Sequence, residues 1–363
     1  MYRYVSDTIA FETAEETLTS LYDLISRVES KVELVPPEDT LQGMSLFDSE
    51  EELANFIPLG LNAEFDSLVR FKQSDYILMG GKRGSGKSVT CSNLANTVYA
   101  SGKSVLYFSI EMPTKEILQR QAAIGAQVPH SKIKYKSLEH HEMLRVVEWW
   151  ANRYENADKH IAAYKEHRCF DKFHKLLIQE PLKPAQLHVV YDPSLTLPKL
   201  KAEVIKMVRK LGNVGLVIVD YVNQIKRTSS SDDKFDWKDQ IHVSTALKEL
   251  AGQLQVPFFS PYQIDASGEA RFAKGILDSA DAAFTLEAGE DQIAFTCTKI
   301  RGDAKIHFSS KVNWSTLTIG PENGNPVIHD PEDEPTKGKS FKKKKEEDVP
   351  VMDMNGIYDD LPF

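Results

Sequence analysis

The sequence is poor in cysteine and contains no long apolar run. Its three cysteines, Cys91, Cys169 and Cys297, are too few and too far apart for a disulfide framework or a paired metal motif, so we expect buried free thiols. No apolar run approaches the roughly 20 residues that span a bilayer, and residues 1–10 lack a signal-peptide pattern. We therefore expect a cytoplasmic protein with no membrane partner.

An excess of positive charge is also missing. The formal net charge of −9 argues against nonspecific coating by nucleic acid, although it says little about one local channel or loop. Metal-binding motifs are incomplete: no histidine follows His140, His141 and Glu142 at H-E-x-x-H spacing, and His167, Cys169 and His174 lack a fourth ligand. We interpret both clusters as structural helix residues.

What the sequence does contain is a phosphate-binding loop. An apolar run, Tyr76–Met79, leads into a segment that matches G-x-x-x-x-G-K-[ST], and a helix is predicted over Val89–Ala100. In such a loop the backbone N–H groups surround a phosphate, the lysine reaches the β- and γ-phosphates, and the hydroxyl holds Mg²⁺. We expect ATP and Mg²⁺ to be bound through Gly81, Gly84, Ser85, Gly86, Lys87, Ser88 and Val89, with Ser88 as a metal ligand.

Apolar runs of strand length alternate with helical patterns through the middle of the chain. Unbroken apolar strands that alternate with helices indicate an α/β fold whose mostly parallel sheet is covered on both faces. The run Gly215–Asp220 ends in an aspartate, which would emerge at the carboxyl end of its strand and accept a metal-bound water. Asp220 is therefore the second predicted metal residue. The other predicted strands are Val105–Ile110, Leu187–Tyr191, Val256–Ser260, Ala282–Leu286, Ile293–Lys299 and Lys305–Phe308.

The two ends of the chain differ from this middle part. Residues 1–56 contain one amphipathic helix that begins at a capping box of Thr13 and Glu16, and it packs either on its own domain or on a neighbouring subunit. Residues 57–322 form the predicted globular domain. Residues 323–363 are charged and too poor in apolar residues to fold alone, which predicts a disordered tail.

Several stretches together resemble the RecA-like core of the DnaB-like hexameric replicative DNA helicases of superfamily 4, over about Ile57–Ile319. The resemblance implies an ATP hydrolase that moves along single-stranded DNA as a ring of six subunits and separates the duplex. A recombinase-like ATPase that forms filaments and a non-unwinding accessory protein switched by nucleotide remain alternatives. The stretches are the phosphate loop, Tyr107–Pro113 followed by Arg120, Val219–Gln224, Gln263, and Lys299–Gly302, in which the glycine comes one position early.

The resemblance also implies roles for single residues. Glu111 would polarise the water that attacks the γ-phosphate, and Gln263 would sense that phosphate. Lys299 and Arg301 would reach into the nucleotide site of the neighbouring subunit. The simpler interpretations are that Glu111 caps a helix and that Lys299 and Arg301 are charged residues of an edge strand. The family places its DNA-binding loops after the fourth and fifth strands. Here these loops are Lys226–Trp237 and Asp265–Gly275, which contain Lys226, Arg227, Lys234, Arg271 and Lys274.

The ends of the chain bear on the partners that the resemblance implies. Residues 1–56 are enough for a linker helix but too few for the helical collar that meets primase in this family. The chain in this respect is similar to a compact, phage-type version of these helicases, which would act in the cytoplasm of a host cell. The end, Gly356–Phe363, resembles the acidic, Pro-Phe-ended tip of bacterial single-stranded-DNA-binding proteins. Three roles are open for this tip, and above all for Asp359–Phe363. It would dock replication proteins such as a primase, a loader or a single-stranded-DNA-binding protein, or it would occupy the chain's own DNA groove. The third alternative is an acidic tail without function.

Overall fold

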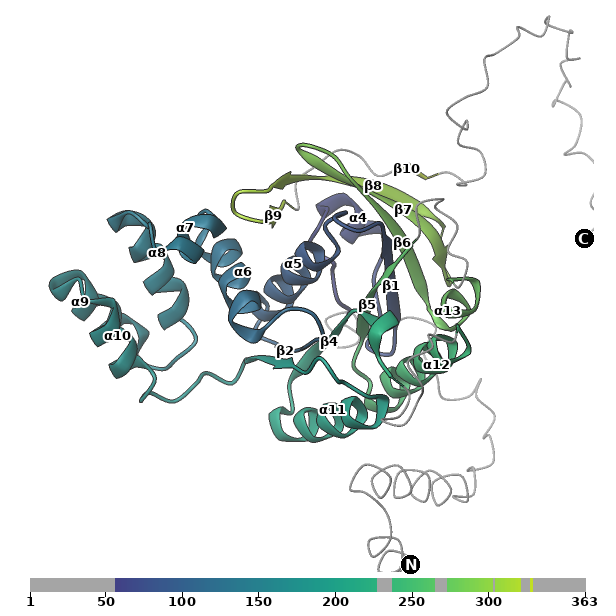
Figure 1. Cartoon of the computed structure of the whole chain (residues 1–363), viewed down its shortest axis with the longest axis horizontal. Helices are drawn as coiled ribbons and strands as arrows, with labels where there is room; N and C mark the ends of the chain where they lie inside the picture. The colour runs from purple at the N-terminus through teal and green to yellow at the C-terminus, as the bar shows by residue number, and fades with distance from the viewer. Residues whose placement is uncertain (1–55, 227–236, 265–272, 303, 321–326, 329–363) are drawn as a thin grey trace, which may run out of the picture. The chain divides into compact units, whose positions relative to one another are not determined.

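The computed structural model describes residues 56–226, 237–264, 273–302, 304–320 and 327–328. The strands are β1 (Tyr76–Gly81), β2 (Ser104–Ser109), β3 (Leu187–Tyr191), β4 (Val214–Asp220), β5 (Phe258–Gln263), β6 (Ala282–Ala288), β7 (Gln292–Ile300), β8 (Ile306–Asn313), β9 (Thr318–Ile319) and β10 (Val327–Ile328). They form one sheet in the order β10-β8-β7-β6-β1-β5-β4-β2-β3, with β9 paired to β8 (Figure 1). This confirms the predicted α/β class.

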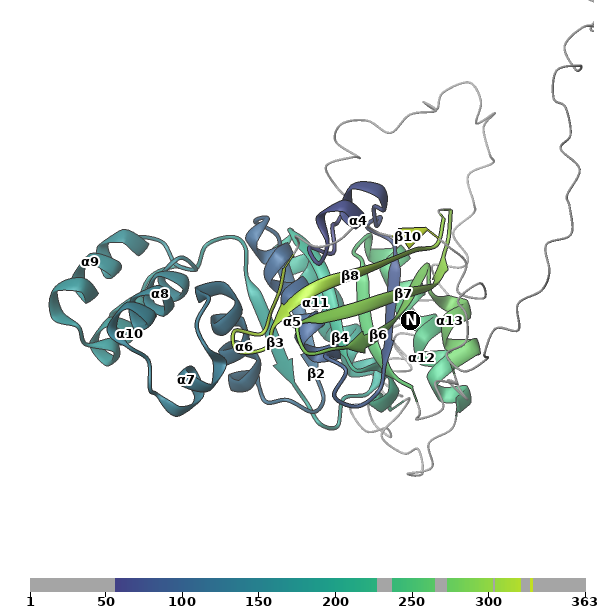
Figure 2. The same ribbon diagram turned by 90° about the horizontal axis from the view of Figure 1, so that it is seen from above.

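Helices cover both faces of the parallel part of this sheet. The described helices of the chain are α4 (Ala63–Leu68), α5 (Lys87–Ala100), α6 (Thr114–Ala126), α7 (His130–Tyr135), α8 (His140–Ala151), α9 (Ala157–His167), α10 (Phe170–Leu177), α11 (Leu197–Leu211), α12 (Trp237–Leu254) and α13 (Ala273–Ser279), with a 3₁₀ turn, η1, at Val222–Gln224. Strands β6, β1, β5, β4, β2 and β3 run parallel, whereas β7 and β8 extend the sheet antiparallel. Strand β1 lies between β5 and β6, in the middle of the sheet (Figure 1). Figure 2 shows the molecule from above, with β3 and β10 toward opposite ends of the sheet.

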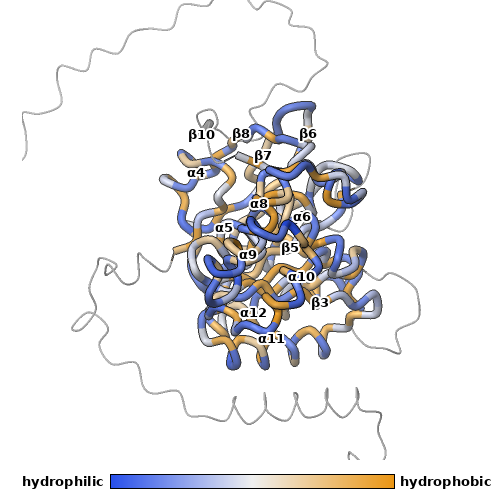
Figure 3. The backbone as a smooth tube through the Cα atoms, turned by 90° about the vertical axis from the view of Figure 1, so that its left-hand side faces the viewer, coloured by the Kyte–Doolittle hydropathy of each residue, from blue (hydrophilic) through white to orange (hydrophobic). Residues whose placement is uncertain are grey.

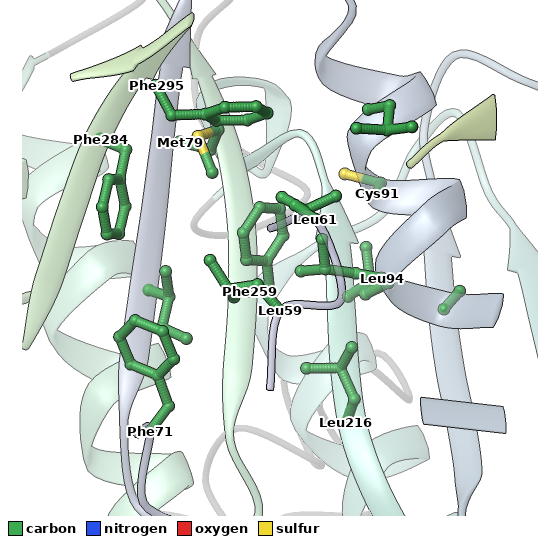
Figure 4. Packing of buried hydrophobic residues seen from close by; sticks show 14 of the residues in the cluster. Leu59, Leu61, Phe71, Met79, Cys91, Leu94, Leu216, Phe259, Phe284 and Phe295 are labelled. Atoms are coloured by element: carbon green, nitrogen blue, oxygen red, sulfur yellow. The ribbon is translucent and has the colours of Figure 1, made fainter. Parts of the chain in front are cut away.

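Two cores lie on opposite faces because successive strand residues point to opposite sides. On β1, Ile77 and Met79 join the cluster under α4 and α5, whereas Tyr76 and Leu78 join the cluster under α11 and α12. Figure 4 shows part of the first cluster, in which the segment before α4 packs beside α5. All residues of β1, β2 and most of β4 are buried, which explains why these strands are continuous apolar runs in the sequence.

Helix α11 shows how one stripe of apolar residues determines a surface helix. Leu197, Leu200, Val204 and Met207 are buried and recur at steps of three and four residues, so they lie on one side of the helix. Figure 3 shows the resulting alternation of hydrophobic and hydrophilic residues along the coil of α11. The helix ends at Gly212, which adopts a left-handed conformation with φ of 70°.

The predicted helical region 137–175 forms three helices, α8, α9 and α10, with a small core of their own around Val147, Tyr164 and Phe173. Trp149 packs against its own chain: its ring fills the space above Gly125 of α6. The guanidinium of Arg153 lies 3.5 Å from the centroid of Trp149 and 5.0 Å from that of Tyr99 on α5. Burial lowers the pKa of Arg153 to about 10. The contacts of its guanidinium with Trp149 and Tyr99 join this helical region to α5, the helix that follows the phosphate loop.

Several details differ from the sequence predictions. Cys91 and Cys297 are buried as expected, but Cys169 is exposed because it precedes α10 at the surface. The segment predicted as a loop from Asp265 to Gly275 becomes helical at Ala273, where α13 begins. Strand β5 runs to Gln263, so this residue ends the strand and does not follow it.

Some predicted features lie outside the residues that the structure describes. The helix expected in residues 1–56 and the tail 323–363, apart from β10, lie outside the described residues, and the domain boundaries remain predictions. No helix among the described residues is long and apolar enough to cross a membrane. The same residues contain no group of three or more histidine, cysteine or acidic side chains placed to hold a metal.

Candidate nucleotide-binding site

Four parallel strands end side by side and form the carboxyl edge of the sheet. The register pairs Gly81 of β1 with Gln263 of β5, and Ser109 of β2 with Asp220 of β4. Because ligands of parallel α/β sheets bind outside the carboxyl ends of the strands, this edge is the expected binding site. A pocket of about 490 Å³ lies there, a size suited to a small ligand such as a nucleotide.

The phosphate loop lines this pocket and turns directly into α5. Gly84 and Gly86 have φ of 81° and 89°, a region that a residue with a Cβ rarely adopts. Lys87 Nζ donates to the carbonyl oxygens of Gly81 and Lys82 at 2.7 Å, and burial lowers the pKa of Lys87. Ser85 Oγ is buried and has no hydrogen-bond partner within the described residues. The loop thus combines one ammonium, a helix N-terminus and an unpaired hydroxyl, a chemistry that suits phosphate.

Ser88 and Asp220, the two predicted metal residues, lie next to each other in the structure. Ser88 Oγ lies 3.4 Å from Asp220 Oδ1, while Tyr107 Oη donates to Asp220 Oδ2 at 2.8 Å. Burial raises the pKa of Asp220, and the bonds from Tyr107 and Ser88 oppose that rise. A hydroxyl and a carboxylate are hard oxygen donors of the kind that Mg²⁺ prefers, so the donor set fits this ion. Sequence reasoning missed Tyr107, whose side chain fixes one carboxylate oxygen.

Glu111 lies next to the same pocket, two residues after β2. Its Oε1 accepts hydrogen bonds from Tyr221 Oη at 3.1 Å and from Gln224 Nε2 at 3.0 Å. Gln224 Nε2 also donates to Tyr221 Oη at 2.6 Å, which closes a ring of three side chains. We call Glu111, Tyr221 and Gln224 the Glu111 cluster. Glu111 therefore has side-chain partners across the pocket, an arrangement that a helix cap would not require.

Gln263 also lines the pocket, at the end of β5. Its backbone N–H donates to Asn223 Oδ1 at 3.0 Å, and Asn223 Nδ2 donates to Gln240 Oε1 on α12 at 2.9 Å. Asn223 belongs to η1, the same turn that supplies Gln224. One short turn thus contacts both the predicted water-activating residue and the predicted γ-phosphate sensor.

Lys299 and Arg301 do not join this pocket. Arg301 pairs with Asp281 Oδ1 at 3.2 Å and donates to the carbonyl of Asp278, and Lys299 Nζ donates to the carbonyl of Leu277 at 2.6 Å. Asp281 N donates to the carbonyl of Tyr76, so this group lies at the start of β1. With a rise of about 3.3 Å per residue, the five steps of β1 from Tyr76 to Gly81 span about 16 Å, so Arg301 and the phosphate loop lie near opposite ends of this strand.

Besides Arg83 and Tyr221, Arg120 and Trp314 line the pocket, and the sequence predicts no role for any of the four. Arg120 of α6 pairs with Glu116 at 3.0 Å, and its Nε is buried without a partner among the described residues. Trp314 closes another side, where a Cβ added to Gly86 would lie 3.2 Å from its ring. Arg120 lies in α6, the helix that follows Glu111, and could have been considered as a site residue. The residues next to Trp314 in the sequence do not indicate that its side chain lines the pocket.

The predicted DNA-binding residues are only partly described. Lys226 is exposed and follows Ile225, the residue after η1, and its backbone forms hydrogen bonds with Leu195 and Leu197. Lys274 lies in α13, although its side chain is not described, and Arg227, Lys234 and Arg271 lie outside the described residues. Their role stays a prediction.

Comparison with known proteins identifies the family. The chain is 25% identical over 256 residues to the replicative DNA helicase DnaB of Haemophilus influenzae, covering 70% of this chain and 48% of the relative. It is 21% identical over 319 residues to a probable replicative DNA helicase of Trieres chinensis, covering 87% of this chain and 60% of the relative. The chain therefore spans about half to three-fifths of the length of these two relatives.

Solved structures support the same fold. One structure, described as an ATPase domain, aligns with a TM-score of 0.58 at 13% identity, covering 84% of this chain and 98% of that one. A DnaB-like replicative helicase, solved in a study of its interactions with primase, aligns with a TM-score of 0.60 at 12% identity, covering 87% of this chain and 73% of that one. The family model for the DnaB-like helicase C terminal domain matches residues 60–280, more than half of the sequence. The chain therefore belongs to the DnaB-like helicase C terminal domain family.

Proposed function

We propose that this protein is an ATP-dependent replicative DNA helicase that works as a ring, most simply of six subunits, and moves along single-stranded DNA. The observation that carries the proposal is the separation of two groups within one chain. The phosphate loop, Glu111 and Asp220 gather at the carboxyl edge, whereas Arg301 lies at the other end of β1. A second copy of the chain supplies that arginine to the site, so each site is complete only between subunits.

In this proposal each residue of the carboxyl edge has one task. Lys87 and the loop amides bind the β- and γ-phosphates, and Ser88 with Asp220 holds Mg²⁺. When bound, Mg²⁺ neutralises phosphate charge as hydrolysis proceeds. Glu111 orients the attacking water and accepts its proton, and Gln263 contacts the γ-phosphate. Lys299 and Arg301 of the neighbouring copy stabilise the charge that develops on the transferred phosphoryl group.

The DNA and protein partners are proposed from residues that the structure describes only in part. Lys226, Arg227, Lys234, Arg271 and Lys274 contact the DNA backbone without reading bases. The C-terminal tip docks a replication protein such as a primase, a loader or a single-stranded-DNA-binding protein. The protein acts in the cytoplasm, or in that of a host cell if a phage encodes it, as its helicase relatives suggest.

Unwinding of a forked DNA duplex tests the proposal. Wild type opens the fork with ATP and Mg²⁺, and the variants Lys87→Ala and Arg301→Ala do not. If wild type hydrolyses ATP but opens neither 5′-tailed nor 3′-tailed forks, the accessory-protein alternative replaces this proposal. Filaments in place of closed rings in electron micrographs with an ATP analogue would favour the recombinase alternative.

A mixing experiment tests the shared site directly. Combining Lys87→Ala with Arg301→Ala subunits restores part of the ATPase, because an intact phosphate loop then meets an intact arginine at some interfaces. Mixing either inactive variant with itself provides the baseline. Absence of recovery at every ratio would count against Arg301 acting between subunits.

A further inference from the structure

We infer that Tyr221 and Gln224 are positioning residues that hold the Glu111 carboxylate through one oxygen and leave its other oxygen for the attacking water. The inference rests on the proposed ATPase function and assigns a task to two side chains that carry none so far. Both contacts of the carboxylate, at 3.1 Å from Tyr221 and 3.0 Å from Gln224, end on Oε1. Among the described residues no hydrogen bond to Oε2 is present.

The chemistry of the two partners suits this task. Tyr221 and Gln224 are neutral donors, so they orient the carboxylate without cancelling the charge that makes it a base. A lysine or arginine in their place would form a stronger, charge-assisted bond and would compete with the water for the carboxylate.

The position of the cluster in the fold links it to the metal residue. Tyr221 directly follows Asp220 at the end of β4, and Ile110 N donates to the carbonyl of Asp220 at 3.1 Å, next to Glu111. The same strand end therefore places the carboxylate of Asp220 and the two donors that hold Glu111. Such an arrangement fixes the distance between the phosphate end of the site and the base.

The competing explanation is that these side chains only stabilise the turn. The turn already has backbone bonds of its own, since Gln224 N donates to the carbonyl of Tyr221 and Ile225 N to that of Val222, both at 3.2 Å. Val222 is fully buried beneath it and packs in the core under α11 and α12. The side chains of Tyr221 and Gln224 are therefore not needed to close the turn, and their shared contact is Glu111.

The test uses the full chain with the variants Tyr221→Phe, Gln224→Leu and the double substitution. We expect DNA-stimulated kcat for ATP to fall about 10-fold for each single variant and about 10²-fold for the double variant, the loss typical of a misplaced catalytic group. The KM for ATP and the affinity for a fluorescent ATP analogue stay unchanged. Tyr191→Phe and Gln179→Leu, which alter exposed side chains of the same types, serve as matched controls and keep wild-type kcat.

A second measurement separates positioning from loss of structure. Added to Glu111→Gln, the Tyr221→Phe change produces no further loss of kcat, because a residue that acts through Glu111 has nothing left to orient. An equal loss in both backgrounds, a double variant with wild-type kcat, or a fall in nucleotide affinity would each overturn the inference. If wild type itself fails to hydrolyse ATP, the proposed function fails; if wild type is active and Glu111→Gln is not, any failure belongs to the inference alone.

Discussion

The charged side chains at the two edges of the parallel sheet have different kinds of partner. At the amino edge, Asp281 accepts from Tyr76 N at 2.8 Å, from Lys248 at 2.6 Å and from Arg301 at 3.2 Å, so its charge is matched by basic groups of the same chain. At the carboxyl edge, Lys87 bonds only to backbone carbonyls among the described residues. There Glu111 is held by neutral donors.

The difference shows where the chain keeps charge for a partner molecule. Charges that are paired internally stabilise the fold, whereas charges held by neutral groups keep their field for a ligand. Arg301 belongs to both descriptions because it is paired yet its side chain is 54% exposed, which leaves it accessible to another subunit. The following predictions test this contrast.

The largest expected effect is the loss of activity on changing Arg301. Arg301→Ala lowers kcat for ATP by about 10³-fold or more if it acts as an arginine finger. Its exposed ion pair contributes less than about 1 kcal/mol to stability, so the urea unfolding midpoint stays close to that of wild type. Arg209→Ala, an exposed arginine at the end of α11, is the control and changes neither property. A parallel loss of stability and activity would contradict the separation of the two edges.

Changing Asp281 should reverse that pattern. Asp281→Asn replaces one of the two acceptor oxygens by an NH₂ group and leaves Lys248 and Arg301 without their charged partner, so the free energy of unfolding falls by about 1–3 kcal/mol. The affinity for a fluorescent ATP analogue remains unchanged, because the carboxyl edge lies at the other end of β1. Denaturant unfolding and nucleotide titration measure the two quantities. The exposed Asp278→Asn serves as the control, and weaker nucleotide binding by Asp281→Asn would break the comparison.

A smaller effect is expected for Tyr107. Tyr107→Phe preserves the buried ring but removes the donor to Asp220, and loss of such an outer partner weakens metal binding by about 10-fold. The concentration of Mg²⁺ that gives half-maximal binding of the ATP analogue should rise accordingly. Burial raises the pKa of Tyr107 well above its usual value, so this effect should not vary across neutral pH. Equal Mg²⁺ dependence in Tyr107→Phe and wild type would exclude the outer-partner role.

The smallest effect is expected for the ion pair at the carboxyl edge. Glu116 pairs with Arg120 four residues later on α6, and both side chains are partly exposed. Glu116→Gln should lower the free energy of unfolding by only about 0.3–0.5 kcal/mol. A loss as large as that of Asp281→Asn, measured in the same denaturant, would show that both edges use charge pairing to the same extent.

Much of this arrangement could be predicted from sequence, because strong local patterns remained local in the structure. The phosphate loop lies between β1 and α5, Asp220 ends β4, and β3 has the predicted bounds. Apolar runs bounded by polar residues define buried strands, so the errors fell at strand ends. The largest is in β8, which continues to Asn313 where the prediction stopped at Phe308. The family that the ordered motifs resemble was confirmed by the family match.

Other features could not be predicted because they depend on contacts between distant segments. Tyr107 and Asp220 are 113 positions apart, and only the pairing of β2 with β4 brings them together. Trp314 reaches the pocket from the turn between β8 and β9, with no local signal in its neighbours. The position of Trp149 likewise depends on Gly125 in another helix, whose missing side chain makes room for the ring.

The sequence by itself determined the phosphate loop, the order of strands and helices and the acidic residue at the end of β4, since each depends on neighbouring residues. Only the tertiary structure decided which oxygen of Glu111 is held, which carboxylate Tyr107 contacts, and that Arg301 lies at the far end of β1 from its own phosphate loop. The physical reason is that strand pairing sets distances between residues that are far apart in the chain, and no periodicity within one segment encodes a register between two.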